Sequence, residues 1–388
     1  MRRIRRVHVL GATLAAALCV PASGVSSGSA TPTLQTKIGK GEGRLNLIEW
    51  PAYSDPSFAK KFEQTTGCKI HRKDAGSSNE MVALMHTGGG GGGGQYDLVS
   101  ASGDASLRLI VGGDVKAVNV NLIPSWKQFI SIFKSPAHNT VKGVHYGVSV
   151  QWGPNTLMYN TKKVKPAPTG WSSLYSSKYK GKITVPNNPI QIADGALYLM
   201  ETKPSLGIKD PYELTKSQLS AVVSLLKRQK PLIRKYWNSA TDEINLFKGG
   251  DAVIGASWPY QTLTLQAAKQ PIKEIIPKFG ATGWADTWML AKKAPHPNCA
   301  YMWMKYVTTP QVEAKQALVF GETPVNRKAC SYMNKMQKGS CAKYHLNQPL
   351  SFYKKIRFWK TPIPDCGNGQ KNCADNNAWQ RAWTQITG

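Results

Sequence analysis

Arg44-Leu45-Asn46-Leu47-Ile48-Glu49 is the stretch from which the fold can be predicted, because it opens a repeating order of elements. It is apolar enough for a β-strand, and Ser54-Asp55-Pro56 follows with proline where the first turn of a helix tolerates it. Gly67 is a typical helix end, and residues 68–73 predict the next strand. The stretch therefore begins a strand–helix–strand unit.

The same order continues, and it sets the fold class. Ser77-Ser78-Asn79-Glu80 is a capping box, in which Ser and a Glu three residues later satisfy free backbone groups at a helix start. A strand at Tyr96–Ser100 and a helix at Leu107–Val111 follow. Such alternation predicts an α/β fold with mixed sheets flanked by helices. Further strands are expected at residues 143–150, 156–159, 183–185, 252–256 and 284–290, and helices at 214–226, 298–307, 351–358 and 377–386.

Seven consecutive glycines, Gly88–Gly94, match a dinucleotide-binding pattern only trivially. That pattern follows a strand and opens a helix, whereas this run follows a predicted helix and precedes the strand at Tyr96–Ser100. We predict a flexible loop without a phosphate-binding role.

Residues 1–30 have the composition of an export signal. Four arginines precede Val7, a short apolar stretch runs to Val20, and Gly28-Ser29-Ala30 fits a cleavage site. The apolar stretch is too short to span a bilayer, and Leu18 before Cys19 is bulkier than lipid-attachment sites prefer. We expect a cleaved leader and a soluble mature protein that is periplasmic, secreted or at the cell surface.

Six cysteines follow the leader: Cys68, Cys299, Cys330, Cys341, Cys366 and Cys373. An even number in an exported chain predicts disulfide bonds, although the sequence does not choose among the pairings. Cys366 and Cys373 are the easiest local pair. A metal site is the rival interpretation, but the chain has no C-x-x-C motif and no nearby pair of histidines, so disulfides are favoured.

The net charge is +28, and the leader's four arginines account for four of it, which leaves +24. A balance this basic suggests contact with a polyanion such as nucleic acid, anionic lipid or a cell-wall polymer. The lysines are scattered through every segment, however, which is typical of a basic, soluble surface with adventitious polyanion affinity.

Aromatic and polar side chains follow several predicted strands. In open α/β sheets ligands lie beyond the carboxyl ends of the strands, and a few polar groups among aromatic rings form a small-molecule site. The side chains at these ends are Trp50, Tyr53, Ser102, Asp104, Asn188, Gln191, Trp258, Tyr260, Trp284 and Asp286.

One of these strand ends is Gly283-Trp284-Ala285-Asp286-Thr287-Trp288, a carboxylate between indoles. A buried Asp is costly unless it pairs with a cation or accepts hydrogen bonds, and Trp faces attract cations. The stretch fits either a small binding site for an amine or a polar turn beside a Trp-lined core.

Several segments, taken in order, resemble those of a known family. They are residues 47–50 and 62–67, Tyr96-Asp97-Leu98-Val99, Leu157-Met158-Tyr159-Asn160, Tyr179-Lys180-Gly181-Lys182, Gly283-Trp284-Ala285-Asp286 and Gly321-Glu322-Thr323-Pro324-Val325-Asn326. From Arg44 to Arg327 the chain is similar to the extracytoplasmic solute-binding proteins of ABC importers, in their spermidine/putrescine-binding branch. The Cys-containing tail looks like one exported subgroup of that branch.

The resemblance implies two α/β lobes, joined by crossing strands, that close over a ligand in the cleft between them. The first lobe would comprise residues 44–149 and 285–327, and the second residues 150–284 and 328–388 with the Cys-containing tail. The crossings would lie near Tyr146–Trp152 and Trp284–Leu290, which places Asp286 at a hinge.

The resemblance also assigns roles in the ligand site. In the family, aromatic rings enclose the methylene chain of a polyamine while carboxylates hold its ammonium groups. Trp50, Trp258 and Trp284 match the aromatic positions, and Asp286 matches a carboxylate. The alternative for Trp258 and Trp284 is plain core packing.

This chain departs from the family pattern in two places. Asn188 and Gln191 replace an acidic pair, and Asp104, which a helix cap would also explain, stands where an aromatic residue is frequent. Since amides offer hydrogen bonds without charge, we expect a ligand with one ammonium group near Asp286 and a neutral or anionic other end. Asp104 or Glu322 would restore a second anion, which keeps putrescine open.

No catalytic residue, metal or cofactor is expected. The histidines are dispersed, H-E-x-x-H does not occur, and G-x-S-x-G occurs only at Gly24–Gly28, within the predicted leader. On the resemblance, we predict a monomeric solute-binding protein that delivers a small amine-bearing solute to the permease and ATPase subunits of an ABC importer. The alternative is an exported protein that binds DNA, polyphosphate or a cell-wall polymer through its basic surface.

Overall fold

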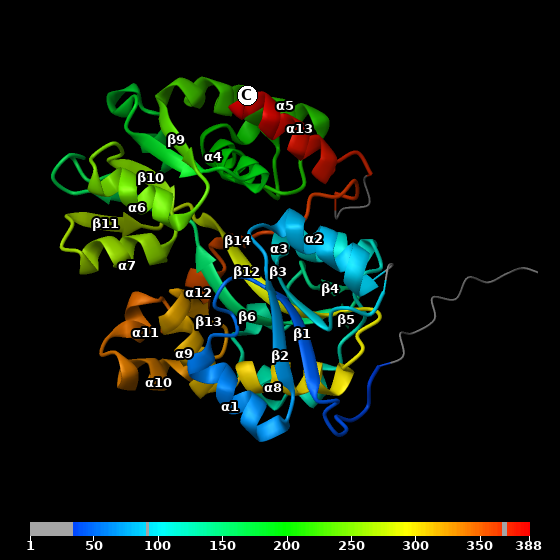
Figure 1. The fold of residues 1–388 in the computed structure, drawn as a ribbon. Helices are drawn as coiled ribbons and strands as arrows, with labels where there is room; N and C mark the ends of the chain where they lie inside the picture. Colours follow the sequence, from blue (N-terminus) through cyan, green and yellow to red (C-terminus); the bar gives the residue numbers. More distant parts are fainter. Residues whose placement is uncertain (1–33, 91–92, 367–370) are drawn as a thin grey trace, which may run out of the picture. The chain divides into compact units, whose positions relative to one another are not determined.

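The computed structural model describes residues 34–90, 93–366 and 371–388, so the predicted leader at residues 1–30 lies outside them. A seven-stranded sheet contains the first strand and has the order β13-β6-β12-β3-β1-β2, with β14 beside β12 (Figure 1). Its strands are β1 (Arg44–Glu49), β2 (Lys69–Asp74), β3 (Leu98–Ser102), β6 (Gly147–Pro154), β12 (Ala281–Leu290), β13 (Thr323–Pro324) and β14 (Ile356–Phe358). As the strand–helix order predicts, β1 pairs in parallel with β2 and β3, whereas β12 runs antiparallel to β3 and β6.

A second sheet has five strands in the order β11-β7-β10-β8-β9. They are β7 (Thr156–Asn160), β8 (Ile183–Pro186), β9 (Ile233–Trp237), β10 (Ile254–Ser257) and β11 (Ile272–Ile275), and a separate hairpin joins β4 (Thr140–Val141) to β5 (Val144–His145). The chain passes from the first sheet to the second at Asn155 and returns between β11 and β12. The residues predicted to cross, in β6 and β12, thus belong to the seven-stranded sheet.

Helix α1 begins and ends where the sequence provides caps. Asp55 accepts a hydrogen bond from the Ser57 amide at 2.8 Å at the start of α1, and Gly67 ends that helix with a φ of 74°. The helices are α1 (Pro56–Thr66), α2 (Ser78–Met85), α3 (Gly103–Val111), α4 (Ile192–Thr202), α5 (Lys216–Gln229), α6 (Ala240–Lys248), α7 (Pro259–Ala267), α8 (Pro297–Val307), α9 (Pro310–Phe320), α10 (Ala329–Met336), α11 (Ser340–Lys343), α12 (Leu350–Tyr353) and α13 (Asn376–Thr387).

Helices α4, α5 and α13 form one packed group in the part of the chain that carries the five-stranded sheet (Figure 1). The C-terminal α13 packs on α5, although more than a hundred residues separate them in the sequence. The C-terminal tail contributes to both parts of the chain, because α13 packs on α5 whereas β14 pairs with β12 of the seven-stranded sheet.

Two expectations for local structure were wrong. Part of the glycine run is not a loop, because His86–Gly90 forms one π-helical turn that continues α2; residues 91–92 lie outside the described chain. The helix expected at residues 351–358 stops at Tyr353, and residues 356–358 form β14 instead. The free edge of β12 at Ala281–Gly283 offers backbone partners that the local sequence does not reveal.

Three disulfide bonds confirm the interpretation of the cysteines. Cys366 pairs with Cys373, as proximity suggests, and the other bonds join Cys68 to Cys299 and Cys330 to Cys341. Over the described ranges, no group of three or more potential ligand side chains is arranged to hold a metal ion. In the same ranges no helix is long and apolar enough to cross a membrane.

Candidate functional site

Asp286 lies at the centre of a cluster of buried oxygen atoms. The register of β12 places it opposite Ser102 of β3 and Gln151 of β6, at a bulge in the strand pairing. The Ser102 hydroxyl donates to Asp286 Oδ1 at 2.5 Å, and the Tyr53 hydroxyl contacts Asp286 Oδ2. The same Tyr53 hydroxyl lies 2.6 Å from Glu322 Oε2, so one phenol links two carboxyl groups.

This cluster has more acceptors than protons. A phenol carries one proton and donates to one carboxylate, so the second carboxyl group donates to the Tyr53 oxygen only when it is itself protonated. Tyr53 is 0% exposed, Asp286 2% and Glu322 5%, so bulk solvent is excluded from the cluster. The ligand-free cluster is therefore expected to hold an additional proton.

The electrostatics of the cluster agree with this proton count. Burial raises the pKa of Asp286 to about 7, and the charge of Asp104 adds to the rise, against the hydrogen bonds from Ser102 and Tyr53. Burial, followed by the charge of Asp286, raises the pKa of Glu322 well above its ordinary value. A cation placed here would favour the charged carboxylates and displace a proton.

Two of the predicted aromatic residues face each other beside the passage between the sheets. The Trp258 and Trp284 rings meet edge to face, with their centroids 6.3 Å apart. Trp258 Nε1 donates to Asn155 Oδ1 at 3.1 Å, which ties this ring to the residue where the chain changes sheets. Trp284 is 7% exposed, and its ring covers Gly153, where a Cβ atom would lie 2.3 Å from the indole. Only glycine fits beneath this ring without displacement.

The remaining predicted residues lie apart from the carboxyl cluster. Trp50 follows β1 and is half-buried, with its backbone amide donating to Ser100 Oγ at 3.1 Å. Asn188 caps the short helix that leads into α4, through the Ile190 amide at 3.1 Å. Asp104 accepts from Ser78 Oγ at 2.9 Å in the first turn of α3. Asp104 and Asn188 line one polar pocket of about 140 Å³.

A further carboxylate, the partly buried Asp194, was missed by the sequence analysis. It follows Gln191 by three residues and accepts hydrogen bonds from the Thr282 hydroxyl and from Asn155 Nδ2, at 3.3 Å for the latter. The same Asn155 amide donates to Gln191 Oε1 at 3.1 Å. The three-residue spacing puts Gln191 and Asp194 on one helix face and was the available signal, although their partners come from distant segments.

The comparisons with known proteins point in one direction. Residues 57–338 match the family described as bacterial extracellular solute-binding protein. The putrescine/agmatine-binding protein of Pseudomonas aeruginosa is 23% identical over 316 residues, which cover 77% of this chain and 83% of that protein.

Solved structures share the fold. The TpPotD lipoprotein of Treponema pallidum superimposes with a TM-score of 0.70 at 20% identity, covering 88% of this chain and 99% of that one. A structure described as the Atu4243-GABA receptor gives a TM-score of 0.63 at 18% identity, covering 89% and 97%. These likenesses confirm the predicted α/β architecture of periplasmic binding proteins, and the family match confirms the prediction of a solute-binding protein in place of an enzyme. The chain belongs to the bacterial extracellular solute-binding protein family.

Proposed function

We propose that this protein captures a small solute that carries an ammonium group and serves as the binding component of an ABC importer. The buried cluster of Tyr53, Asp286 and Glu322 is the observation that carries the proposal. Its contacts among the described residues are with hydroxyl groups and other acids. An ammonium group supplies both the positive charge and the hydrogen-bond donors that such a cluster lacks.

The position of Glu322 favours a solute with a single ammonium group. Because Tyr53 contacts both carboxyl groups, Glu322 adds its charge to the same end of the site as Asp286. Gln191 and Asn188 offer amides, and both already make hydrogen bonds within the protein. The names of two similar proteins, a putrescine/agmatine-binding protein and a GABA receptor, include solutes of both kinds.

The aromatic residues would hold the aliphatic body of the solute. Trp258 and Trp284 are adjacent, and Trp258 is only half-buried, so its ring has a face available to a ligand. Trp50, whose indole nitrogen has no hydrogen-bond partner among the described residues, would supply a further wall. We propose that the parts carrying the two sheets act as lobes that close over the solute, with Asn155 at one hinge strand.

The remaining parts of the proposal concern partners and location. The closed, solute-bound protein would deliver its cargo as a monomer to permease and ATPase subunits, in the periplasm or at the cell surface. The net charge of +28 keeps adventitious polyanion binding as a secondary property of the surface.

A thermal-shift screen tests the function. Putrescine, agmatine, GABA, other amino acids and a polyphosphate would be added to the mature protein, and an amine that binds should raise the melting temperature by linkage. Asp286→Asn should remove the shift, because Asn cannot balance an ammonium charge. Asp251→Asn, at an exposed carboxylate paired with Arg234, is the matched control and should keep it.

Two outcomes would overturn the proposal. One is an unchanged shift in Asp286→Asn, which would place the ammonium group elsewhere. The other is a protein that no amine stabilises while polyphosphate binds with a steep dependence on salt, as expected for a polyanion-binding surface.

A further inference from the structure

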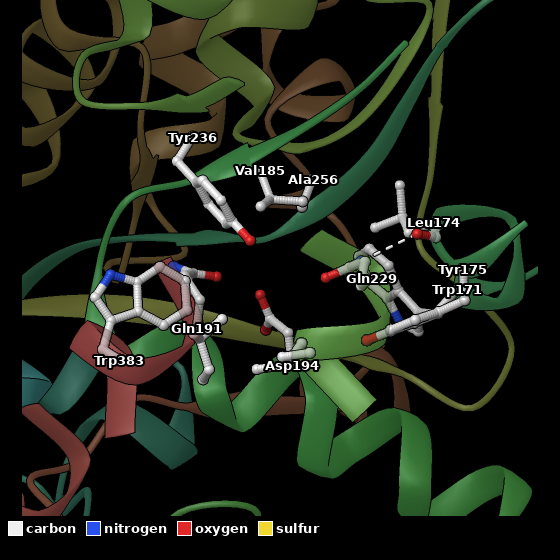
Figure 2. Close-up of a pocket in the computed structure, with 12 residues that line it drawn as sticks. Trp171, Leu174, Tyr175, Val185, Gln191, Asp194, Gln229, Tyr236, Ala256 and Trp383 are labelled. Carbon is white, nitrogen blue, oxygen red and sulfur yellow. Dashed lines mark hydrogen bonds between the residues drawn. The ribbon is translucent and has the colours of Figure 1, made fainter. Parts of the chain in front are cut away.

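A small cavity lies within the part of the chain that carries the five-stranded sheet. Its volume is about 30 Å³, enough for one or two molecules the size of water. Residues of β8, β9 and β10 and of helices α4, α5 and α13 form its wall (Figure 2). None of the candidate solute-site aromatics lines it, but Gln191 does, so the cavity adjoins the site proposed above at that residue.

Polar groups converge on this cavity. Figure 2 shows the Asp194 carboxyl, the Tyr236 hydroxyl and the side-chain amides of Gln191 and Gln229 pointing into the same space. Gln191 and Gln229 are each 4% exposed. The Tyr236 hydroxyl has no hydrogen-bond partner among the described residues, and its oxygen is free to accept a hydrogen bond from an occupant. Gln191 Nε2 also lacks such a partner, but it is a donor and therefore not a ligand for a cation.

The chemistry of the wall is that of a cation site. Gln229 Nε2 donates to the Leu174 carbonyl at 3.0 Å, which leaves its oxygen free to accept. Tyr175 and Tyr236 add phenol oxygens, and four aromatic rings surround the space: Trp171, Tyr175, Tyr236 and Trp383. Not one of the twelve lining side chains, all within the described chain, is basic.

Asp194 is the lining residue whose charged form a cation would stabilise most. Its partners Thr282 and Asn155 are neutral donors, and burial raises the pKa of Asp194 to about 7. A water molecule donates two hydrogen bonds and brings no charge. An ammonium ion donates four, neutralises the carboxylate and can face aromatic rings.

We propose that this cavity is a second binding site, for an ammonium ion or the head of a primary amine no longer than methylamine. The ion donates hydrogen bonds to Asp194, to Gln229 Oε1 and to the phenol oxygen of Tyr236. Since Asp194 and Gln191 share Asn155 as donor, and Asn155 also accepts from Trp258, the occupied site fixes a side chain beside the candidate solute cleft.

Nuclear magnetic resonance with ¹⁵N-labelled ammonium tests the proposal directly. The mature Asp286→Asn protein is the starting variant, because it removes one of the two acids of the other carboxyl cluster, where the ion would compete. A buried ammonium ion gives its own slowly exchanging proton signal, and addition of ammonium chloride should produce one. Sodium chloride at the same ionic strength should raise the melting temperature less than ammonium chloride does.

The second change is Asp194→Asn in the same Asp286→Asn background, with an expected loss of ammonium affinity of about tenfold or more. Should that variant fail to fold, Tyr236→Phe removes one acceptor conservatively and is expected to weaken binding about fivefold. The proposal is overturned if Asp286→Asn shows no bound-ammonium signal at high concentration. It is equally overturned if the signal survives both substitutions, or if sodium stabilises the protein as well as ammonium does. Because every arm lacks Asp286, these results do not depend on the proposed solute site.

Discussion

Lowering the pH from about 8 to about 6 is predicted to weaken amine binding strongly. Asp286 has a pKa raised to about 7, and an ammonium ligand pairs with its ionised form. The ligand itself, with an ordinary amine pKa near 10, stays charged throughout. The ionised fraction of Asp286 then falls about tenfold between the two pH values, and the affinity should fall with it. Glu322, whose pKa burial also raises well above its ordinary value, makes the decrease steeper if it also ionises on binding.

Isothermal titration calorimetry measures both the affinity and the proton. At about pH 6 the apparent binding heat should differ between two buffers that have different enthalpies of ionisation. The difference should correspond to about one proton released per amine bound. Near pH 8 the release from Asp286 should almost vanish. Glu322→Gln removes one acid and should reduce the proton release without abolishing binding.

A flat profile would refute this reasoning. If the dissociation constant changes less than twofold over this range, and the heat is the same in both buffers, the ammonium group does not displace a proton from Asp286. The carboxyl cluster would then be a structural network of hydrogen bonds.

Three further predictions concern stability. As the pH rises from about 5 to about 8, the ligand-free protein should lose about 2 kcal/mol more stability in urea unfolding than Asp194→Asn loses. The reason is that an acid whose pKa in the folded protein is raised to about 7 stabilises the fold only while it keeps its proton. Equal losses in the two proteins would contradict this. Gly153→Ala, which drives a Cβ atom into the Trp284 ring, should cost about 1–3 kcal/mol in the same assay and weaken amine binding, and a neutral result would show that the ring moves freely. Replacing Cys68 and Cys299 by Ala removes a disulfide between residues 231 positions apart and should lower the free energy of unfolding by about 4–5 kcal/mol. A loss below about 1 kcal/mol would mean that this disulfide does not restrain the unfolded chain.

Local signals in the sequence were sufficient for much of the fold. The caps around α1 depend on neighbours only, so Asp55 and Gly67 marked its ends correctly. The alternation of apolar strands with helices implied the parallel pairing of β1 with β2 and β3. Cys366 and Cys373 paired because a short link leaves them close together.

Features that depend on distant segments were not visible. β14 forms because β12 extends past β3 and offers free backbone groups, a property of the sheet and not of residues 356–358. The partners of Asp194 come from β12 and from Asn155, so its environment appears only when the chain is folded. Cys68 and Cys299 likewise meet only in three dimensions.

The candidate site shows the same division. The sequence identified Asp286 as a carboxylate among indoles, and the strand register then supplied Ser102 as its donor. The expectation that Glu322 restores a second anionic end stays a prediction, and its shared contact with Tyr53 favours one end over two. That arrangement depends on the loop after β1 meeting the segment before β13, which no local pattern records.

Native mass spectrometry of the mature protein, purified from its own cells without added ligand, shows whether the carboxyl cluster holds an amine. We predict a bound solute of small mass that contains an amine and is absent from Asp286→Asn purified in parallel. A bound solute without an amine, or one that Asp286→Asn retains in equal amount, would contradict it.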